Sequence, residues 1–171
     1  MIILYFILGI IAALLLIALV SPARYLVEKS IVINKPVNEV YMKVADLNYY
    51  NKWNPWQQSD PTATANITGS ADSIGHRYGW EGKKVGVGSL TLANRTTNQN
   101  IHFDLEFVKP WKSKADDDWT FANENGNTKV VWRNSGGLPF PVARIMGPMI
   151  KKNLNHQFEV GLSNLKKMCE R

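Results

Sequence analysis

The stretch Ile101-His102-Phe103-Asp104-Leu105-Glu106-Phe107 decides the fold of this chain. Apolar residues occupy every odd position of the stretch, and polar residues occupy every even position. Because successive side chains of a β-strand point to opposite faces of the sheet, this period of two predicts a strand with one dry face and one solvated face. A sheet with a dry face needs another element to cover that face.

Six consecutive strands are predicted around this stretch, each ending at Gly, Asn, Pro or a Lys-rich break. They cover Thr62–Gly69, Gly75–Gly82, Val85–Arg95, Gln99–Lys109, Ser113–Asn123 and Thr128–Ser135. The pair Asn125-Gly126 is the strongest turn signal, since both residues accept the positive φ that tight hairpins require. Short turns between consecutive strands predict an antiparallel meander. Tyr25–Ile33 predicts a seventh strand, and Pro36–Ala45 and Asp46–Asn51 predict two short helices.

The end of the chain, Pro139 to Met168, is predicted to be helical. Its apolar residues recur at a spacing of three and four and form one stripe; they are Ile150, Leu154, Phe158, Leu162 and Leu165. The pair Gly147-Pro148 is expected to kink or split this helix. The helix is the only predicted element large enough to cover the dry face. We therefore expect an α+β fold, in which a curved sheet around a single helix leaves an apolar cavity between them.

The first twenty residues are apolar except for Gly9. A helix of this length spans about 30 Å, the thickness of the hydrocarbon core of a bilayer, and Ser21-Pro22 then ends it. We expect one transmembrane anchor over residues 1–22, followed by a single soluble domain over residues 23–171. A cleaved signal peptide is the alternative, although its basic n-region is missing and the apolar run is long for one. This organisation excludes a multi-span transporter and a multi-domain enzyme.

The charges indicate the partners and the side of the membrane. Arg24 and Lys29 follow the apolar segment and none precedes it, which predicts a cytoplasmic soluble domain. Two glycosylation triplets, Asn66-Ile-Thr68 and Asn94-Arg-Thr96, leave the opposite side open. The net charge of +6 is dispersed over the soluble part. It therefore favours attraction to a membrane surface, and we expect no nucleic acid partner.

Four stretches resemble the START-like superfamily, also called SRPBCC or helix-grip proteins, and within it the polyketide cyclase/dehydrase type. They are Val27–Tyr41, Asp46–Trp56, Tyr78–Gly88, and Thr128–Trp132 together with Gly161–Lys166. The second matches the family pattern D-x-x-x-x-x-x-W-x-P-W, whereas Lys35 in the first stands where the family usually has Ala. The resemblance covers residues 25–168. It implies the helix-grip fold, a seven-stranded curved antiparallel sheet gripping a long C-terminal helix. It also implies a hydrophobic ligand, although some members catalyse ring closure and others only regulate.

Two titratable residues are candidates for chemistry. His76 has the strand parity of Trp80 and can face the cavity. Asp117 has the parity of Trp119, and an unpaired carboxyl in a dry cavity would have a raised pKa suited to general acid or base work. A hydrogen-bonding role for His76 and a solvated acidic run at Asp117 are the alternatives. No metal or cofactor is expected, because no histidines have metal-ligand spacing and Cys169 is the single cysteine.

The remaining candidates are large apolar residues that could line a ligand site. They are Trp53, Trp56, Tyr78, Trp80, Phe103, Phe107, Trp119, Phe121, Trp132, Met146, Met149 and Phe158. Filled core is the alternative for each of them. The Pro-broken stretch Leu138–Met149 suits a cavity mouth. The sequence thus predicts a membrane-anchored binder of a hydrophobic small molecule or lipid. A cyclase/dehydratase-type enzyme using His76 or Asp117, and a regulatory interaction domain without a ligand, are the alternatives.

Overall fold

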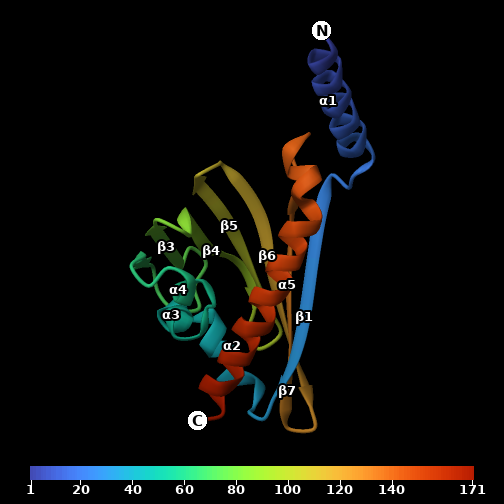
Figure 1. Cartoon of the computed structure of the whole chain (residues 1–171). Helices are drawn as coiled ribbons and strands as arrows, with labels where there is room; N and C mark the ends of the chain where they lie inside the picture. The colour runs from blue at the N-terminus through green and yellow to red at the C-terminus, as the bar shows by residue number, and fades with distance from the viewer.

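The computed structural model describes the chain from Met1 to Arg171, apart from the side chain of Gln58. Seven antiparallel strands form one sheet in the order β1-β7-β6-β5-β4-β3-β2, and this sheet curves around one long C-terminal helix (Figure 1). The strands are β1 (Arg24–Ile33), β2 (Thr64–Thr68), β3 (Arg77–Gly82), β4 (Gly86–Thr96), β5 (Asn100–Lys109), β6 (Ser113–Glu124) and β7 (Asn127–Gly137). The predicted α+β architecture with a seven-stranded sheet is therefore confirmed.

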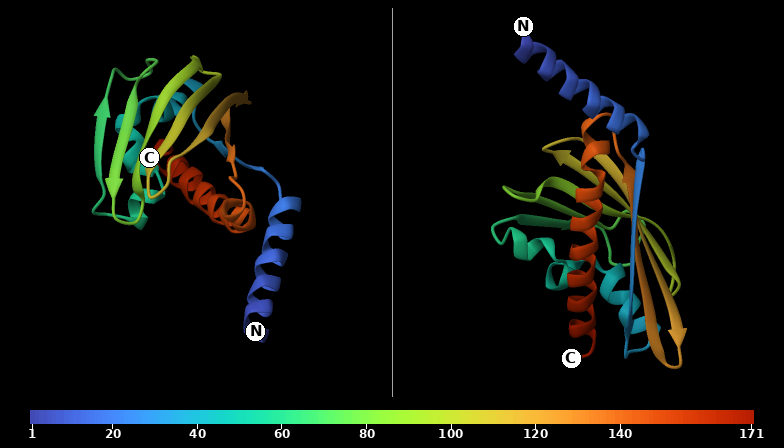
Figure 2. Two further views of the ribbon diagram at one scale, coloured as in Figure 1. Left: turned by 90° about the horizontal axis from the view of Figure 1, so that it is seen from above. Right: turned by 45° about the vertical axis from the view of Figure 1, so that its right-hand side comes forward.

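The helices lie on the concave side of the sheet, as Figure 2 shows from above. The long helix is α5 (Val142–Cys169), and it packs against β1 and the sheet. Between β1 and β2 the chain forms α2 (Val37–Ala45), the 3-10 turn η1 (Leu47–Tyr49), α3 (Tyr50–Trp53) and α4 (Trp56–Ser59). These short elements cover the part of the concave face that α5 leaves free.

Helix α5 is continuous through Pro148. Of the two outcomes expected at Gly147-Pro148, a kink or a split, the split is wrong. A proline near the helix start removes one backbone hydrogen bond, while the rest of this 28-residue helix remains packed on the sheet. Gly147 is buried, and a Cβ there would lie 3.0 Å from the Cδ1 atom of Leu138. This glycine therefore lets the segment before α5 approach the helix closely.

The N-terminal helix α1 (Ile2–Val20) projects from the domain, and Ala18 is its buried residue. By length and composition α1 is able to cross a membrane, a property that a signal sequence at an N-terminus shares. Its last turns contact the beginning of α5 (Figure 1).

The dry face of the sheet has two unlike halves. Trp119 of β6 pairs with Trp132 of β7, and their rings stack with centroids 4.5 Å apart. Four residues along each strand, Ala115 pairs with Gly136 on the same face. We call the part around Trp119 and Trp132 the filled half and the part around Ala115 and Gly136 the open half. The open half lies toward the start of β1, where Tyr25 pairs with Gly136.

Candidate functional site

A cavity of about 360 Å³ lies between the open half of the sheet, α5 and the short helices α3 and α4. Its apolar and aromatic lining consists of Tyr25, Tyr50, Trp56, Ala63, Tyr78, Trp80, Val85, Leu90, Leu105, Phe107, Leu154 and Phe158. Its polar lining consists of Asn54, Gln57, Ser59, Lys84, Asp117, Asn134, Asn153 and Gln157. The volume is within the range of about 300–1,000 Å³ that is usual for small-molecule sites.

Two glycines in the sheet allow aromatic rings to form the cavity wall. A Cβ at Gly136 would lie 2.8 Å from the ring of Tyr25, and a Cβ at Gly88 would collide with the ring of Trp80. Both rings therefore lie over the sheet at points where a side chain would otherwise stand. In the rows where the filled half has indole rings, the open half has Ala115 and Gly136, and the ring of Tyr25 takes the space over Gly136.

Asp117 lies at the boundary between the two halves, and its side chain reaches the cavity floor. It is 5% exposed. Its carboxylate accepts hydrogen bonds from Nε1 of Trp119 at 2.8 Å, Nε1 of Trp132 at 2.9 Å and Nδ2 of Asn134 at 3.1 Å. Burial raises the pKa of Asp117 to about 6, although these three donors lower it in part. The alternative of a solvated Asp117 is therefore wrong.

Tyr25 extends this polar network to the cavity wall. Its hydroxyl donates to Oδ1 of Asn134 at 2.8 Å, which leaves Nδ2 of Asn134 pointing at Asp117. Burial raises the pKa of Tyr25 to about 12, and the nearby charge of Asp117 adds to the shift. Tyr25 thus stays a proton donor at neutral pH, and Asp117 is the network's titratable group in that range.

His76 lies outside the cavity lining, in a fully buried position just before β3. Its Nε2 accepts from the backbone N–H of Leu47 at 3.0 Å, and its Nδ1 lies 3.1 Å from the carbonyl oxygen of Thr68. The tautomer with the proton on Nδ1 satisfies both bonds. His76 thereby connects η1 to β2, and both of its ring nitrogens are occupied.

The structure brings part of the predicted ligand set together. Trp56, Tyr78, Trp80, Phe107 and Phe158 line the cavity with Asp117. Five other members pack in the core; they are Trp53, Phe103, Trp119, Phe121 and Trp132. Met146 and Met149 lie on the surface of α5 and are 36% and 60% exposed.

Several lining residues were missed by sequence reasoning. The sequence pattern places Leu105 in the alternating strand and Leu154 in the helical stripe without marking either as a lining residue. Both residues line the cavity. Tyr25 and Asn134 had not been singled out at all. Their roles depend on the register that places Tyr25 opposite Gly136, and no local sequence pattern indicates that pairing.

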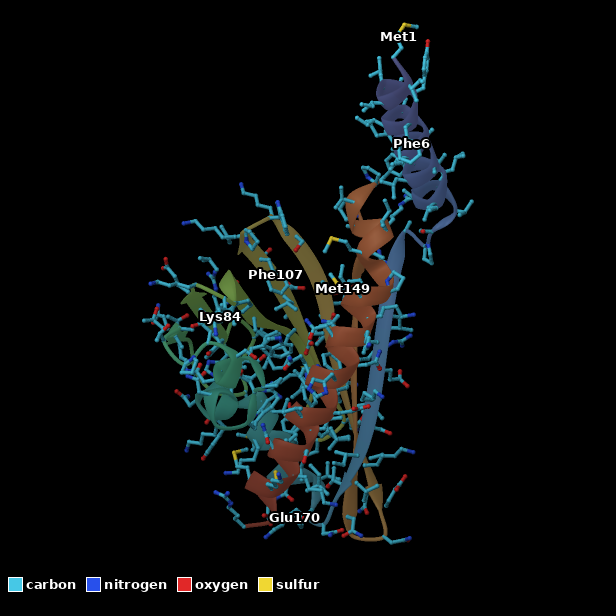
Figure 3. The ribbon with its side chains drawn as sticks, viewed as in Figure 1. Met1, Phe6, Lys84, Phe107, Met149 and Glu170 are labelled. Atoms are coloured by element: carbon cyan, nitrogen blue, oxygen red, sulfur yellow. The ribbon has the colours of Figure 1, made fainter. Side chains whose placement is uncertain are left out.

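A rigid turn borders the cavity on the side of β3 and β4. The exposed side chain of Lys84 lies on this turn, and Figure 3 shows Lys84 and Phe107 on the side of the domain across from Met149 of α5. The carboxylate of Asp60 accepts the backbone N–H of Lys84 at 2.7 Å and that of Val85 at 3.3 Å. The bond from Lys84 is the main reason why the pKa of Asp60 is lowered. Asp60 therefore holds the turn in place as an ionised group.

Among the side chains that the structure describes, no three His, Cys, Asp or Glu residues come together as metal ligands. The cavity chemistry is accordingly that of an apolar chamber with one buried carboxyl and a few amide and hydroxyl groups.

Comparison with known proteins supports the fold. By sequence, the chain matches no protein-family model and no curated protein. Protein CV1439 from Chromobacterium violaceum superposes with a TM-score of 0.64 at 14% identity, over 85% of this chain and 97% of that one. The Aha1 dimer from Colwellia psychrerythraea gives 0.59 at 16% identity, over 85% and 96%. CalU16 from Micromonospora echinospora gives 0.53 at 12% identity, over 83% and 84%.

Identities this low establish the fold alone. The sequence resemblance is thus confirmed for the fold: the chain shares with these proteins the helix-grip fold, a seven-stranded antiparallel sheet packed against a long C-terminal helix.

Proposed function

We propose that this chain is a membrane-anchored protein that binds a hydrophobic small molecule or lipid in the cavity between the sheet and α5. The observation that carries the proposal is the cavity of about 360 Å³, whose walls are mainly aromatic and aliphatic. Burial of apolar ligand surface in such a chamber contributes about 25 cal/mol per Å² to affinity. The helix-grip fold, typical of binders of hydrophobic ligands, supports the same conclusion.

Helix α1 serves as the anchor in this proposal. It has nineteen residues and almost no burial against the domain, so its apolar surface needs a lipid environment. The nearest cations, beginning with Arg24, all follow it along the chain. By the positive-inside rule, the domain then lies in the cytoplasm.

The polar network at the cavity floor orients the ligand. Asp117, when ionised, accepts a hydrogen bond from a hydroxyl or amide of the ligand and repels a ligand carboxylate. A neutral apolar molecule with one donor group, inserted polar end first, fits both the walls and the floor. Asn134 and Tyr25 hold the carboxylate in place for this contact.

Photo-crosslinking tests the proposal with the full chain in lipid nanodiscs. The probe is a long-chain alcohol that carries a diazirine, and the labelled peptides are mapped by mass spectrometry. We expect labels on Leu105, Phe107 and Leu154 in addition to α1, which lies in lipid under any outcome. Labels confined to α1 would contradict the proposal.

Cavity-filling variants provide the control. Leu105→Trp places an indole in the cavity, whereas Asp104→Trp places the same ring on the opposite, solvated face of β5. We expect Leu105→Trp to abolish the labelling of Phe107 and Leu154, and Asp104→Trp to retain it. Leu154→Trp fills the cavity from the helix side and covers the case in which Leu105→Trp does not fold.

A second candidate, an enzyme of cyclase or dehydratase type, is favoured by one observation only. The buried carboxyl of Asp117 has a pKa near neutrality, as a general acid or base requires. His76 is a weaker candidate for that role because both of its ring nitrogens already bond to backbone groups. The test is Asp117→Asn: loss of turnover on a bound polyketide-like ketone, with crosslinking retained, would favour the enzyme.

A further inference from the structure

The register of the sheet places several segments at the end of the domain where α1 joins it. Arg24, at the start of β1, pairs with Gly137, and Gly136 pairs with Ala115 near the start of β6. The β5–β6 turn and the beginning of α5 therefore lie at the same end as the junction with α1. Figures 1 and 2 show the turn reaching the level of the lower end of α1.

The beginning of α5 exposes an apolar stripe at this end. Val142, Met146 and Met149 follow one another at spacings of four and three, so they share one face of the helix. They are 63%, 36% and 60% exposed, and Phe140 just before them is 47% exposed. Within the part of the domain that the structure describes, these four side chains remain exposed beside the short contact between α5 and α1.

The β5–β6 turn exposes a second apolar group at the same end. Trp111 is 77% exposed and Val108 is 49% exposed. Tryptophan is enriched where proteins meet the headgroup region of a bilayer, because its ring is both apolar and polar. At the opposite end, the corresponding turns consist of Thr97-Asn98-Gln99 and Glu124-Asn125-Gly126, which are polar.

Positive charge accompanies both apolar groups. Lys109 and Lys112 flank Trp111, and Lys151 and Lys152 follow Met149. The chain has no Asp or Glu between Asn125 and Phe158. Lysine beside exposed tryptophan and aliphatic side chains complements an anionic lipid surface.

We propose that Val108, Trp111, Phe140, Val142, Met146 and Met149 form a membrane-docking surface, which rests on an anionic bilayer. The cavity lies between the two apolar groups, because its lining includes Phe107, on β5 just before the β5–β6 turn, and Leu154, little more than one turn beyond Met149 on α5. The cavity then faces the bilayer, and its ligand enters from lipid instead of water. This inference rests on the proposed anchoring by α1, since the same membrane receives both.

Spin labels on the full chain in phosphatidylcholine–phosphatidylglycerol vesicles test the docking surface. Cys169 is replaced by Ala, and Trp111→Cys or Val142→Cys carries the label; Thr97→Cys and Ala122→Cys are the controls toward the opposite end. We expect the labels at 111 and 142 to collide mainly with oxygen, which dissolves in lipid. The control labels should collide mainly with a water-soluble nickel complex.

Charge reversal sharpens the test. Lys109→Glu with Lys112→Glu should lower the oxygen-to-nickel ratio at position 142 severalfold, whereas Lys35→Glu with Lys129→Glu, toward the far end, should leave it unchanged. Nickel access at 111 and 142 equal to that at 97 overturns the proposal. The labels at 111 and 142 can also stay protected from nickel in detergent and show dipolar broadening in their spectra. This result also overturns the proposal, because a second copy then covers the surface.

The failure of this inference differs from failure of the proposed function. If carbonate extraction removes the chain from the vesicles, α1 does not anchor it, and the anchoring in the proposed function fails. A chain that stays bound and is photolabelled in its cavity, but keeps 111 and 142 in water, retains the proposed function and loses only the docking surface.

Discussion

The filled and open halves of the dry face are built from the same strands and from residues of the same parity. One half is packed with aromatic rings, whereas the other borders the cavity. In the filled half, the ring of Trp132 stacks on Phe158 of α5 at 3.8 Å and on Trp119 at 4.5 Å. In the open half, Ala115 and Gly136 take the equivalent positions, the ring of Tyr25 lies over Gly136, and this ring forms part of the cavity wall. One half thus packs the sheet against the helix, and the other borders the cavity.

In this chain, the size of the residues along β6 and β7 distinguishes the two halves. The parity of each strand only decides which side chains face α5. Protein interiors are close-packed, so a row of small residues leaves either a collapsed sheet or a void. Here the stacked rings of the filled half contact α5 through Phe158, and the cavity lies beside this contact.

The largest expected effect is on the filled half. Trp132→Ala should lower the free energy of unfolding by about 3–5 kcal/mol, because the ring is 1% exposed and its removal leaves a large cavity between sheet and helix. Urea unfolding in detergent, followed by circular dichroism, measures the loss. Trp132→Phe keeps the stacking and removes the N–H to Asp117, so it should cost less. A loss below about 1 kcal/mol for Trp132→Ala would show that the filled half is not the main source of cohesion.

The boundary between the halves should make stability depend on pH. The folded pKa of Asp117, about 6, exceeds its ordinary value of 3.8. Between these values the folded chain holds a proton that the unfolded chain has lost. The resulting stability is present below pH 3.8 and is lost as the pH rises through 6. A pKa that is higher by about two in the folded chain corresponds to about 3 kcal/mol of unfolding free energy.

Asp117→Asn isolates this contribution, since other carboxyls titrate in the same range. The difference in unfolding free energy between wild type and Asp117→Asn should change by about 3 kcal/mol between pH 3.8 and about pH 6. Asp116→Asn alters a neighbouring half-exposed carboxyl and should preserve the slope. Equal pH profiles for wild type and Asp117→Asn would mean that Asp117 is solvated.

Much of the fold could be predicted because it depends on local periodicity. The alternation of Ile101–Phe107 and the apolar spacing of α5 identified one dry face and its cover, and all seven strands are present. The continuity of α5 through Pro148 could not be predicted, because it depends on packing of the helix against residues far away in the sequence.

The site was less accessible to sequence reasoning. Parity identified Asp117 and several cavity aromatics, yet it could not separate Phe107 in the cavity from Phe103 in the core. Those two residues lie on the same face of β5 and differ only in what the neighbouring strands place beside them. The pairing of Tyr25 with Gly136 is likewise a matter of register between segments 111 residues apart, which a local pattern does not encode.

Phe103 and Phe107 allow a matched test on one strand, since Phe103 pairs with Asp117 at the boundary and packs in the core, whereas Phe107 lines the cavity. Phe103→Ala should cost about 3–5 kcal/mol, since the ring is 1% exposed. Phe107→Ala should cost roughly half as much, because its ring is half-buried and borders a cavity that already exists. Phe107→Ala should also weaken photolabelling of Leu154, which Phe103→Ala should preserve in the folded fraction. Equal losses of stability would show that Phe107 beside the cavity is packed as tightly as Phe103 in the core.

The smallest effect concerns the polar network at the boundary. Tyr25→Phe keeps the ring against Gly136 and removes the hydroxyl that donates to Asn134 at 2.8 Å, so we expect a loss of about 0.5–1.5 kcal/mol. The Asn134 amide then loses the bond that fixes its orientation, and its donation to Asp117 weakens. Because that donation lowers the pKa of Asp117, the stability profile should shift to higher pH. Tyr49→Phe is the control, since the Tyr49 ring lies by Lys43, away from the network. A Tyr25→Phe profile that coincides with wild type would separate Tyr25 from Asp117 and leave the carboxyl held by the two indoles and Asn134 alone.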